Sequence, residues 1–232
     1  LGKLLYFDPK LSGDASLATN FPGAASLFGF GGGYFQASDL SVGRGYWINM
    51  PSASQSTISV TAATSVTLDL PVRWSMVGGP HGDVIVSAAQ TTNPDIASVF
   101  GFSGGYIQPT TLASAAGYWL NMSNAGQIVL TAGAAARPVP LPPEKTFDGP
   151  ILWARSGDLR QVIELGVEDD AVMALPPLPP MARALDARVQ LAEIDTWQIP
   201  ASAPLQEYVL RVQGEAVSLN WDIPEEMAGQ WE

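Results

Sequence analysis

Short runs of alternating apolar and polar residues recur along this chain, which is the pattern of strands with one buried face. Period-two alternation is clear at 57–60 and 66–72, and aromatic or β-branched runs stand at 28–30, 34–36 and 46–50. Segments rich in Gly, Ser or Asp separate these runs and predict turns. The pattern predicts an all-β fold with antiparallel sheets.

Five further segments of the same kind lie beyond residue 150, each bounded by Gly, Pro or Asp: 151–155, 159–165, 185–191, 206–212 and 216–222. This density of short strands predicts an antiparallel β-sandwich. The run Leu-Pro-Pro-Leu-Pro-Pro at 175–180 lies inside this patterned region rather than in a tail. We therefore interpret it as a rigid loop between strands, in preference to a polyproline ligand for an adaptor domain.

One segment of the chain occurs twice. Residues 26–50 and 98–122 are identical at fourteen of their twenty-five positions, with an offset of 72. Both copies contain Phe-Gly-Phe, Gly-Gly-Tyr and Gly-Tyr-Trp. The second copy begins with a strand-like run at 73–77, and no complete equivalent of this run precedes the first copy. The first copy is therefore either truncated or completed by a strand from elsewhere. The repeat as a whole predicts two small β-modules followed by the sandwich.

The order of Trp74, Met76 and Pro80, followed by Gly-Gly-Tyr and then Gly-Tyr-Trp, resembles a tandem aromatic β-repeat of large secreted bacterial surface proteins. In that family the repeat lies near a C-terminal sorting region. The resemblance covers residues 20–135 approximately and implies an extracellular or cell-surface location in bacteria. The later part of the chain looks like the domain that follows such repeats, because it contains Asp-Ala-Arg at 186–188 and a late Val-Ser-Leu-Asn-Trp-Asp strand.

Residues 1–16 closely resemble the opening segment of bacterial di-haem cytochrome c peroxidases. In that family a Cys-x-x-Cys-His haem site follows, whereas here Leu-Ala-Thr-Asn follows at 17–20. Peroxidase activity therefore does not carry over, and we interpret the segment as a leftover or fused stretch that can add an edge strand. It is too short and too soon interrupted to be a signal peptide, so we expect an export signal to have been removed or to lie upstream.

Charge is distributed unevenly and indicates two parts. The net charge is −11, yet residues 1–140 carry six acids and five bases, whereas residues 141–232 carry sixteen acids and six bases. A Pro-rich segment coincides with this step. We predict an N-terminal extension (1–20), a first repeat copy (21–72), a second copy (73–133), a Pro-rich linker (134–150) and an acidic β-sandwich domain (151–232).

The same composition limits the partners. An acidic surface repels phosphate backbones, which argues against nucleic acid. No run of about 18 apolar residues occurs, so no membrane insertion is expected. The candidate partners are polysaccharide or the other domains of a larger surface protein.

The residues that usually carry chemistry are scarce. With no cysteine in the chain, disulfides, zinc–thiolate sites and covalently attached haem are excluded. The single histidine, His81, lies in a Gly/Pro turn and cannot build a histidine metal site alone. Asp83 and the pair Asp169-Asp170 are weak calcium candidates, and a solvated loop is the preferred interpretation because the Asp-x-Asp-x-Asp spacing of a binding loop is missing. We predict no cofactor and no metal.

The segment at 101–105 fits the Gly-x-Ser-x-Gly pattern of a nucleophile elbow. His81 precedes it, whereas the histidine follows the serine in that enzyme class. The first copy also has Gly31 at the serine position. We interpret both glycine-rich segments as hairpin turns. Carboxylate pairs for glycoside hydrolysis meet only in the fold, and no spacing in the sequence points to one.

These observations predict a non-catalytic structural or adhesive module of a secreted or cell-surface protein. The alternative is a carbohydrate-binding module whose exposed ring faces stack on sugars. Burial of both Trp47 and Trp119 would remove the main support for that alternative. Its candidate ligand-binding residues are the aromatic residues shared by the two copies: Tyr34, Tyr46, Trp47, Tyr106, Tyr118 and Trp119.

Overall fold

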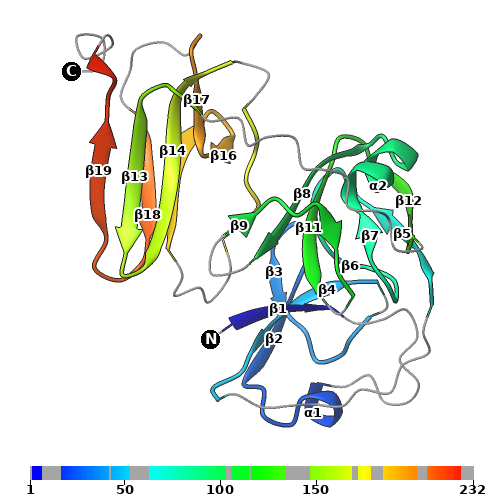
Figure 1. The fold of residues 1–232 in the computed structure, drawn as a ribbon. Helices are drawn as coiled ribbons and strands as arrows, with labels where there is room; N and C mark the ends of the chain where they lie inside the picture. The colour runs from blue at the N-terminus through cyan, green and yellow to red at the C-terminus, as the bar shows by residue number, and fades with distance from the viewer. Residues whose placement is uncertain are drawn as a thin grey trace. The chain divides into compact units, whose positions relative to one another are not determined.

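The chain folds as two compact units in the computed structural model (Figure 1). The first unit comprises Leu1–Pro138 and Leu178–Ala182, and the second comprises Val139–Pro177 and Arg183–Glu232. Strands dominate both units, which confirms the predicted all-β class. Neither helix of the described residues is long and apolar enough to cross a membrane. The structure describes residues 2–6, 17–41, 43–52, 63–102, 106–114, 116–133, 147–168, 172–178, 185–202 and 208–225.

The first unit contains two four-stranded sheets with the same strand order, one for each repeat copy. In both, neighbouring strands pair antiparallel. The sheet of the first copy runs in the order β3 (Tyr34–Gln36), β2 (Ser26–Phe30), β4 (Gly45–Asn49) and β1 (Gly2–Tyr6). The sheet of the second copy runs in the order β9 (Tyr106–Ile107), β8 (Ile96–Phe102), β11 (Gly117–Met122) and β6 (Arg73–Gly78).

Strand β1 occupies the same edge position beside β4 in the first sheet that β6 occupies beside β11 in the second sheet. Tyr6 lies opposite Gly45 in the first sheet, and Gly78 lies opposite Gly117 in the second. Both pairs of positions differ by 72, which is the offset of the repeat. The first copy is therefore completed by a strand from the N-terminal segment 1–16, of which residues 7–16 lie outside the described residues. This agrees with the expectation that the segment adds an edge strand.

The first unit also contains two-stranded pairings and two short helices. Strand β5 (Ser65–Leu70) pairs with β12 (Gly126–Thr131), and its residues alternate between exposed and buried. The alternation predicted for 66–72 is present as far as Leu70, whereas Pro71 and Val72 lie beyond the strand and are both exposed. The predicted strand at 57–60 lies outside the described residues. The other elements are α1 (Leu17–Asn20), α2 (Val86–Thr92) and the pair β7 (Val84–Ile85) with β10 (Thr111–Leu112).

Helix α2 is joined to strand β12 by the buried side chain of Asn93. Its Nδ2 donates to the carbonyl oxygens of Ala89 and Val129, at 2.9 and 3.0 Å, and its Oδ1 accepts from the Val129 N–H at 2.9 Å. The side-chain amide of Asn93 therefore hydrogen-bonds with both the N–H and the carbonyl oxygen of Val129, as a residue of a neighbouring strand would. The helix is fixed against the core of the second copy by this contact.

The second unit is a β-sandwich, as the sequence predicts. One sheet runs in the order β17 (Gln198–Pro200), β14 (Leu159–Val167), β13 (Ile151–Ser156) and β19 (Ser218–Asp222). The other runs in the order β16 (Ile194–Thr196), β15 (Asp186–Leu191) and β18 (Val209–Gln213). One pair, β14 with β17, is parallel, which departs from the predicted all-antiparallel arrangement.

Apolar side chains from both sheets fill the sandwich. The two sheets are also joined by a polar contact between Gln161 on β14 and the backbone of Ala187 on β15. Gln161 Nε2 donates to the Ala187 carbonyl oxygen at 2.7 Å, and the Ala187 N–H donates to Gln161 Oε1 at 2.8 Å. The side-chain NH2 group and the side-chain oxygen of Gln161 therefore both have a hydrogen-bond partner. The buried core of this unit comprises Ala154, Ile163, Leu185, Ala187, Val189 and Ile199.

Candidate functional site

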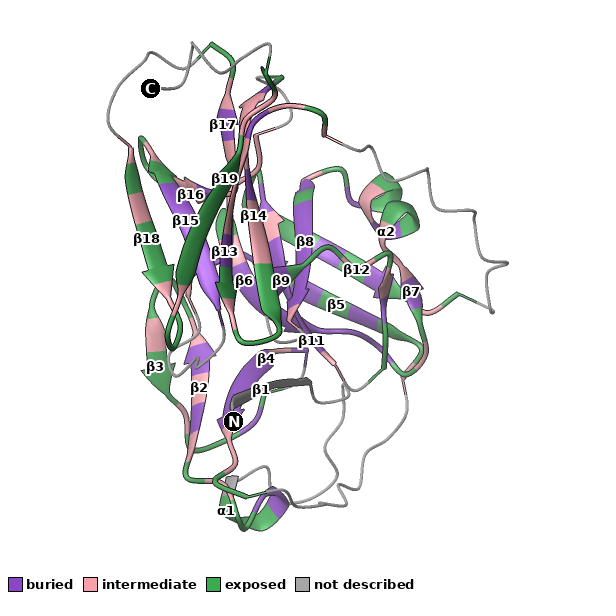
Figure 2. Ribbon diagram, turned by 60° about the vertical axis from the view of Figure 1, so that its left-hand side comes forward, coloured by how far each residue is buried: buried purple, intermediate pink, exposed green. Residues whose placement is uncertain are grey.

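The aromatic residues shared by the two copies lie in the interior of the first unit. Trp47 is 3 % exposed and Trp119 is 0 % exposed. Tyr46, Tyr106 and Tyr118 are buried as well, and Tyr34 is half-buried. Figure 2 shows buried residues along β4, the strand that carries Tyr46 and Trp47. The rings of both tryptophans are therefore not accessible for stacking on a sugar, which removes the main support for the carbohydrate-binding alternative.

The tyrosine of each Gly-Tyr-Trp motif closes a local loop. The Ser41 N–H donates to the Tyr46 hydroxyl at 2.8 Å, and the Ala113 N–H donates to the Tyr118 hydroxyl at 2.7 Å. In both copies the donor lies five residues before the tyrosine. Burial raises the pKa of Tyr118 above its usual value, against the opposing effect of the Ala113 hydrogen bond and with a further contribution from the charge of Asp83.

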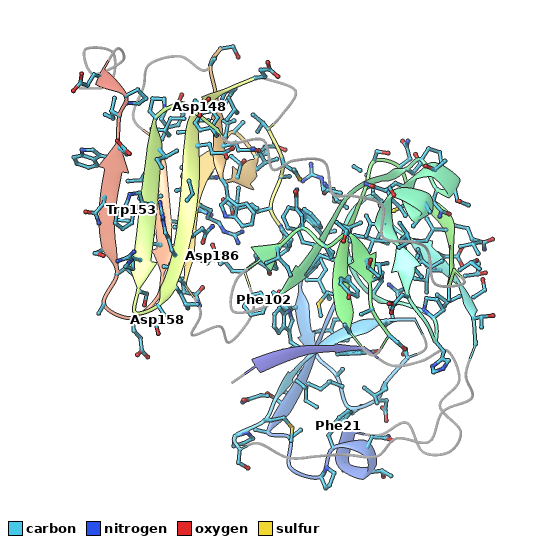
Figure 3. The ribbon with its side chains drawn as sticks, in the orientation of Figure 1. Phe21, Phe102, Asp148, Trp153, Asp158 and Asp186 are labelled. Carbon is cyan, nitrogen blue, oxygen red and sulfur yellow. The ribbon has the colours of Figure 1, made fainter. Side chains whose placement is uncertain are left out.

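The tryptophan of each motif contacts a phenylalanine of the other copy. Trp47 and Phe102 meet edge to face, with 4.9 Å between ring centroids and 83° between ring planes. Trp119 and Phe30 meet in the same way, at 5.0 Å and 76°. Because Trp47 corresponds to Trp119 and Phe30 to Phe102 at the repeat offset, the two contacts are equivalent. Figure 3 labels Phe102, which lies where strands of the two copies meet.

The phenylalanines also contact the tyrosines of the Gly-Gly-Tyr segments. Phe30 and Tyr34 are 5.3 Å apart at 76°, and Phe102 and Tyr106 are 5.4 Å apart at 80°. Each tryptophan therefore faces a Phe–Tyr pair that belongs to the other copy. Interactions of this edge-to-face kind stabilise beyond the area they bury.

The glycine of the first motif permits close approach of the two copies. A Cβ on Gly45 would lie 2.9 Å from the Val77 carbonyl oxygen on β6 of the second copy. The neighbouring residue Arg44 forms a β-bridge with Val77, and the Gly78 N–H donates to the Gly43 carbonyl oxygen at 3.1 Å. Any larger residue at position 45 would push backbone against backbone.

Glycine, tyrosine and tryptophan of the motif therefore each have a packing role, and two of these roles join one copy to the other. The two tryptophan–phenylalanine contacts exchange when the copies exchange, as contacts about a local two-fold axis do. We call this region, formed by the tryptophan–phenylalanine contacts and the approach at Gly45, the inter-repeat joint. The indole N–H groups of Trp47 and Trp119 are buried there and have no hydrogen-bond partner among the described residues.

A pocket of about 230 Å³ lies in the first unit beside the inter-repeat joint. Arg44 is the charged residue among those that line it, and the equivalent position in the second copy is Ala116. None of the described residues that line this pocket is a carboxylate. Its wall is formed by Gly29, Phe30, Gly31, Phe35, Ser41, Arg44, Gly45, Tyr46 and Met76.

The residues weighed for catalysis or metal binding do not converge in the described part of the chain. His81 is exposed, and its backbone N–H donates to the Ala63 carbonyl oxygen. Asp83 is exposed, and Asp169-Asp170 lie outside the described residues. No group of three or more His, Asp or Glu residues that could hold a metal ion occurs within the described ranges.

Both glycine-rich segments connect paired antiparallel strands, as predicted for hairpin turns. In the first copy Phe30 lies opposite Tyr34, with Gly32 at a φ of +83° in the turn. In the second copy Phe102 lies opposite Tyr106. Ser103, the serine of the elbow pattern, lies outside the described residues.

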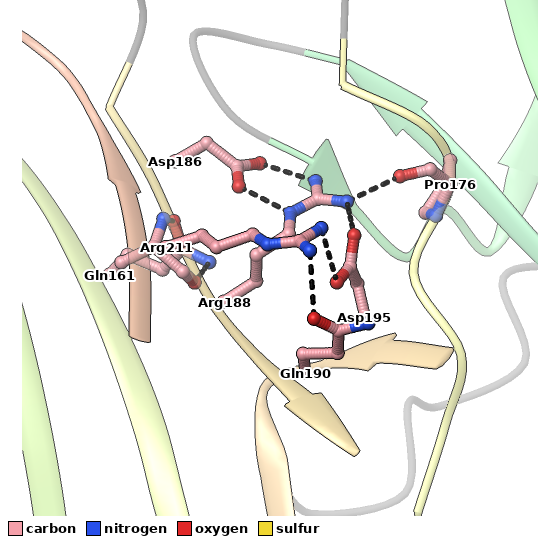
Figure 4. A network of polar contacts seen from close by, with 8 residues as sticks. Gln161, Pro176, Asp186, Arg188, Gln190, Asp195 and Arg211 are labelled. Carbon is pink, nitrogen blue, oxygen red and sulfur yellow. Dashed lines mark hydrogen bonds and ion pairs between the residues drawn. The ribbon is translucent and has the colours of Figure 1, made fainter. Parts of the chain in front are cut away.

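The Asp-Ala-Arg motif of the second unit is a buried ion pair (Figure 4). Arg188 is bidentate to Asp186, with Nε–Oδ1 at 2.6 Å and Nη2–Oδ2 at 2.8 Å. Its Nη1 donates to the Pro176 carbonyl oxygen at 2.8 Å and lies 3.3 Å from Asp195 Oδ2. Buried Leu175 donates its N–H to the Asp195 carbonyl oxygen at 2.7 Å. Leu175 and Pro176 are therefore held within the second unit, in line with the rigid-loop interpretation, while Pro179 and Pro180 lie outside the described residues.

One edge of the sandwich exposes apolar side chains. Strand β19 is the last strand of its sheet and is exposed along its length. Leu219 and Trp221 lie opposite Ala154 and Leu152, so they point to the core side of the sheet, yet Trp221 is 73 % exposed. On its outer side β19 pairs with no other described strand, and an edge of this kind is a place where another strand can add.

Comparison with known proteins gives no match: no protein-family model, no curated protein and no solved structure is similar to this chain.

Proposed function

We propose that this chain is a non-catalytic structural or adhesive module of a secreted or cell-surface bacterial protein. The observation that carries the proposal is the inter-repeat joint. The residues that define the repeat contact the other copy or close their own loop, so their conservation between copies serves packing. The secreted bacterial setting is supported by the resemblance of the repeat to surface-protein repeats.

A structural role is further supported by the way the repeat is completed. A strand at residues 2–6 fills the position that β6 fills in the second copy. Two complete copies joined through equivalent contacts make one rigid unit, which suits a spacer or stalk. The carbohydrate-binding alternative is not carried forward for the shared aromatic residues, because all of them except the half-buried Tyr34 are buried.

The proposal is tested by incubating the purified chain with insoluble cellulose, chitin and neutral xylan. We expect no retention on any of them and no release of reducing sugar ends. Trp47→Ala and Trp119→Ala are measured alongside, with circular dichroism and thermal unfolding as the check of the fold. We expect both variants to lose stability.

Two results would contradict the proposal. Retention that a folded Trp47→Ala or Trp119→Ala variant abolishes would make the motif a sugar-binding surface. Release of reducing ends by the wild-type chain would make the protein an enzyme.

A further inference from the structure

Two arginines lie opposite each other on the outer face of the four-stranded sheet in the second unit. Arg155 on β13 is the cross-strand neighbour of Arg160 on β14. Both guanidinium groups lie over the ring of Trp153, at 5.3 and 5.1 Å from a ring centroid. Ala154 points into the core, so the residues on either side of it point away from the core. Figure 3 labels Trp153 on this strand.

These two arginines differ from the other described arginines of the same unit. Arg188 and Arg211 form ion pairs with aspartates, at 2.6 Å to Asp186 and 3.6 Å to Asp195 respectively. Arg155 and Arg160 form no ion pair among the described residues, although sixteen of the residues from 141 to 232 are acidic. Within the described part of the unit, therefore, no carboxylate is ion-paired with either arginine.

Acidic groups do lie near the arginine pair. Asp158 is in the turn between β13 and β14, and Glu215 is close by because its carbonyl accepts a hydrogen bond from the Ser156 hydroxyl. Neither carboxylate is ion-paired with Arg155 or Arg160 within the described part of the chain. Both arginines are exposed, so both are accessible to a ligand.

Like charges directly opposite each other on a sheet are destabilising, so the arrangement is unfavourable for the fold alone. The ring of Trp153 attracts each guanidinium group and limits its motion. A guanidinium group stacked on a ring keeps the N–H donors at its edge free for hydrogen bonds. The cluster thus presents two sets of pre-oriented donors that a single oxyanion can satisfy.

We propose that Arg155 and Arg160, held on Trp153, bind the carboxylate group of an acidic sugar. A planar carboxylate matches the paired donors of a guanidinium group. Ser218 and Asn220 of β19 lie opposite Arg155 and Trp153 on the same face and supply neutral hydrogen-bonding groups for sugar hydroxyls. This inference deepens the proposed function and rests on it, because it gives the adhesive role a ligand class.

The ligand is a saccharide with isolated carboxylates rather than a dense polyanion. The excess of acids in this unit repels a chain that carries a charge on every residue. That repulsion is screened over about 8 Å at physiological salt, so a single carboxylate in contact with the pair is bound while its neutral neighbours are not repelled.

The test is affinity electrophoresis of the full chain in gels that contain glucuronoxylan, neutral linear xylan, polygalacturonate or dextran sulfate. We expect the chain to be retarded by glucuronoxylan and released by free sodium glucuronate. Arg155→Gln and Arg160→Gln should each weaken the retardation on the order of tenfold, because each removes a charge-assisted hydrogen-bonding group. The double variant should lose it.

Arg211→Gln is the matched control, since it removes the same charge from the other sheet of the same unit. It should bind as the wild-type chain does, and circular dichroism should show that all four variants are folded. Equal retardation by glucuronoxylan and neutral xylan would overturn the proposal, as would unchanged binding by the double variant. Retardation by dextran sulfate alone, or by no polysaccharide, would overturn it too and leave the structural role, which is tested separately by unfolding.

Discussion

Trp119 and Trp221 are the same residue type in opposite surroundings. Trp119 is fully buried in the inter-repeat joint, whereas Trp221 is 73 % exposed on the edge strand β19. Removal of a buried tryptophan leaves a cavity and loses the ring contacts, which costs about 3–5 kcal/mol. An exposed side chain with few neighbours contributes within about 0.5 kcal/mol.

We therefore expect Trp119→Ala to lower the free energy of unfolding by about 3–5 kcal/mol and Trp221→Ala to change it by less than about 0.5 kcal/mol. Urea unfolding followed by circular dichroism measures both. Equal effects of the two substitutions would show that the joint does not have the packing described here.

Tyr118 makes the stability of the first unit depend on pH in the alkaline range. Burial raises the pKa of its hydroxyl in the folded state above the unfolded value of about 10. The folded state then holds the proton more tightly than the unfolded state, so the stabilisation is fully present below pH 10 and is lost as pH rises through the folded pKa.

A series of urea unfolding curves between pH 8 and about pH 11.5 should show stability that is level up to about pH 10 and falls above it. Tyr118→Phe is the matched variant: it lacks the titrating group, so the part of the decline due to Tyr118 should disappear. A wild-type curve that rises above pH 10 would contradict this assignment.

At the scale of elements, β1 decides whether the first copy is complete. It pairs with β4 along its length, from Gly2 opposite Asn49 to Tyr6 opposite Gly45. Without it, the backbone groups on that edge of β4 would lose their partners. Deletion of residues 1–6 should therefore accelerate hydrogen exchange in β4 and β2, measured by mass spectrometry.

The strands of the second unit are an internal control for that deletion, because their core is separate. Their exchange should be unchanged. Unaltered exchange in β4 after the deletion would mean that β1 does not complete the first sheet.

The elements that sequence reasoning identified either have enough residues to display a period or, as β3 does, contain an aromatic run beside a Gly-rich turn. The alternation at 151–155 and 159–165 marked β13 and β14 because each strand has one face on the core. Strands β16 and β17 have three residues each, which is too few for a period. Helix α2 was missed because it has seven residues, no side-chain cap and no charge in its first or last turn.

The candidate site was predicted only in part. The repeat identified the aromatic residues that matter, but their role depends on the position of the other copy, which no local pattern contains. The arginine pair was missed for a related reason. Arg155 and Arg160 are five residues apart across a Ser-Gly-Asp-Leu turn, and only the hairpin register shows that they face each other over Trp153. The sequence does contain one signal for this cluster, which is the presence of two arginines and a tryptophan on either side of a short predicted turn.

At the scale of the whole molecule, the two units have separate cores. The first unit is filled by clusters around β11 and β4, and the second by the cluster that contains Ile163 and Val189. We therefore expect Ile163→Ala to destabilise the second unit by about 2–5 kcal/mol and to leave the first unchanged. Hydrogen exchange of both units under partially denaturing urea measures this, and acceleration in both would contradict it.

The Gly-Tyr-Trp motif joins the two copies into one structural unit. Trp47 belongs to the first copy but contacts Phe102 of the second. The most direct measurement is hydrogen exchange of Trp47→Ala against the wild-type chain. We expect faster exchange in β8 and β11 of the second copy as well as in β2 and β4 of the first. Acceleration confined to the first copy would contradict it, because the copies would then be independent modules.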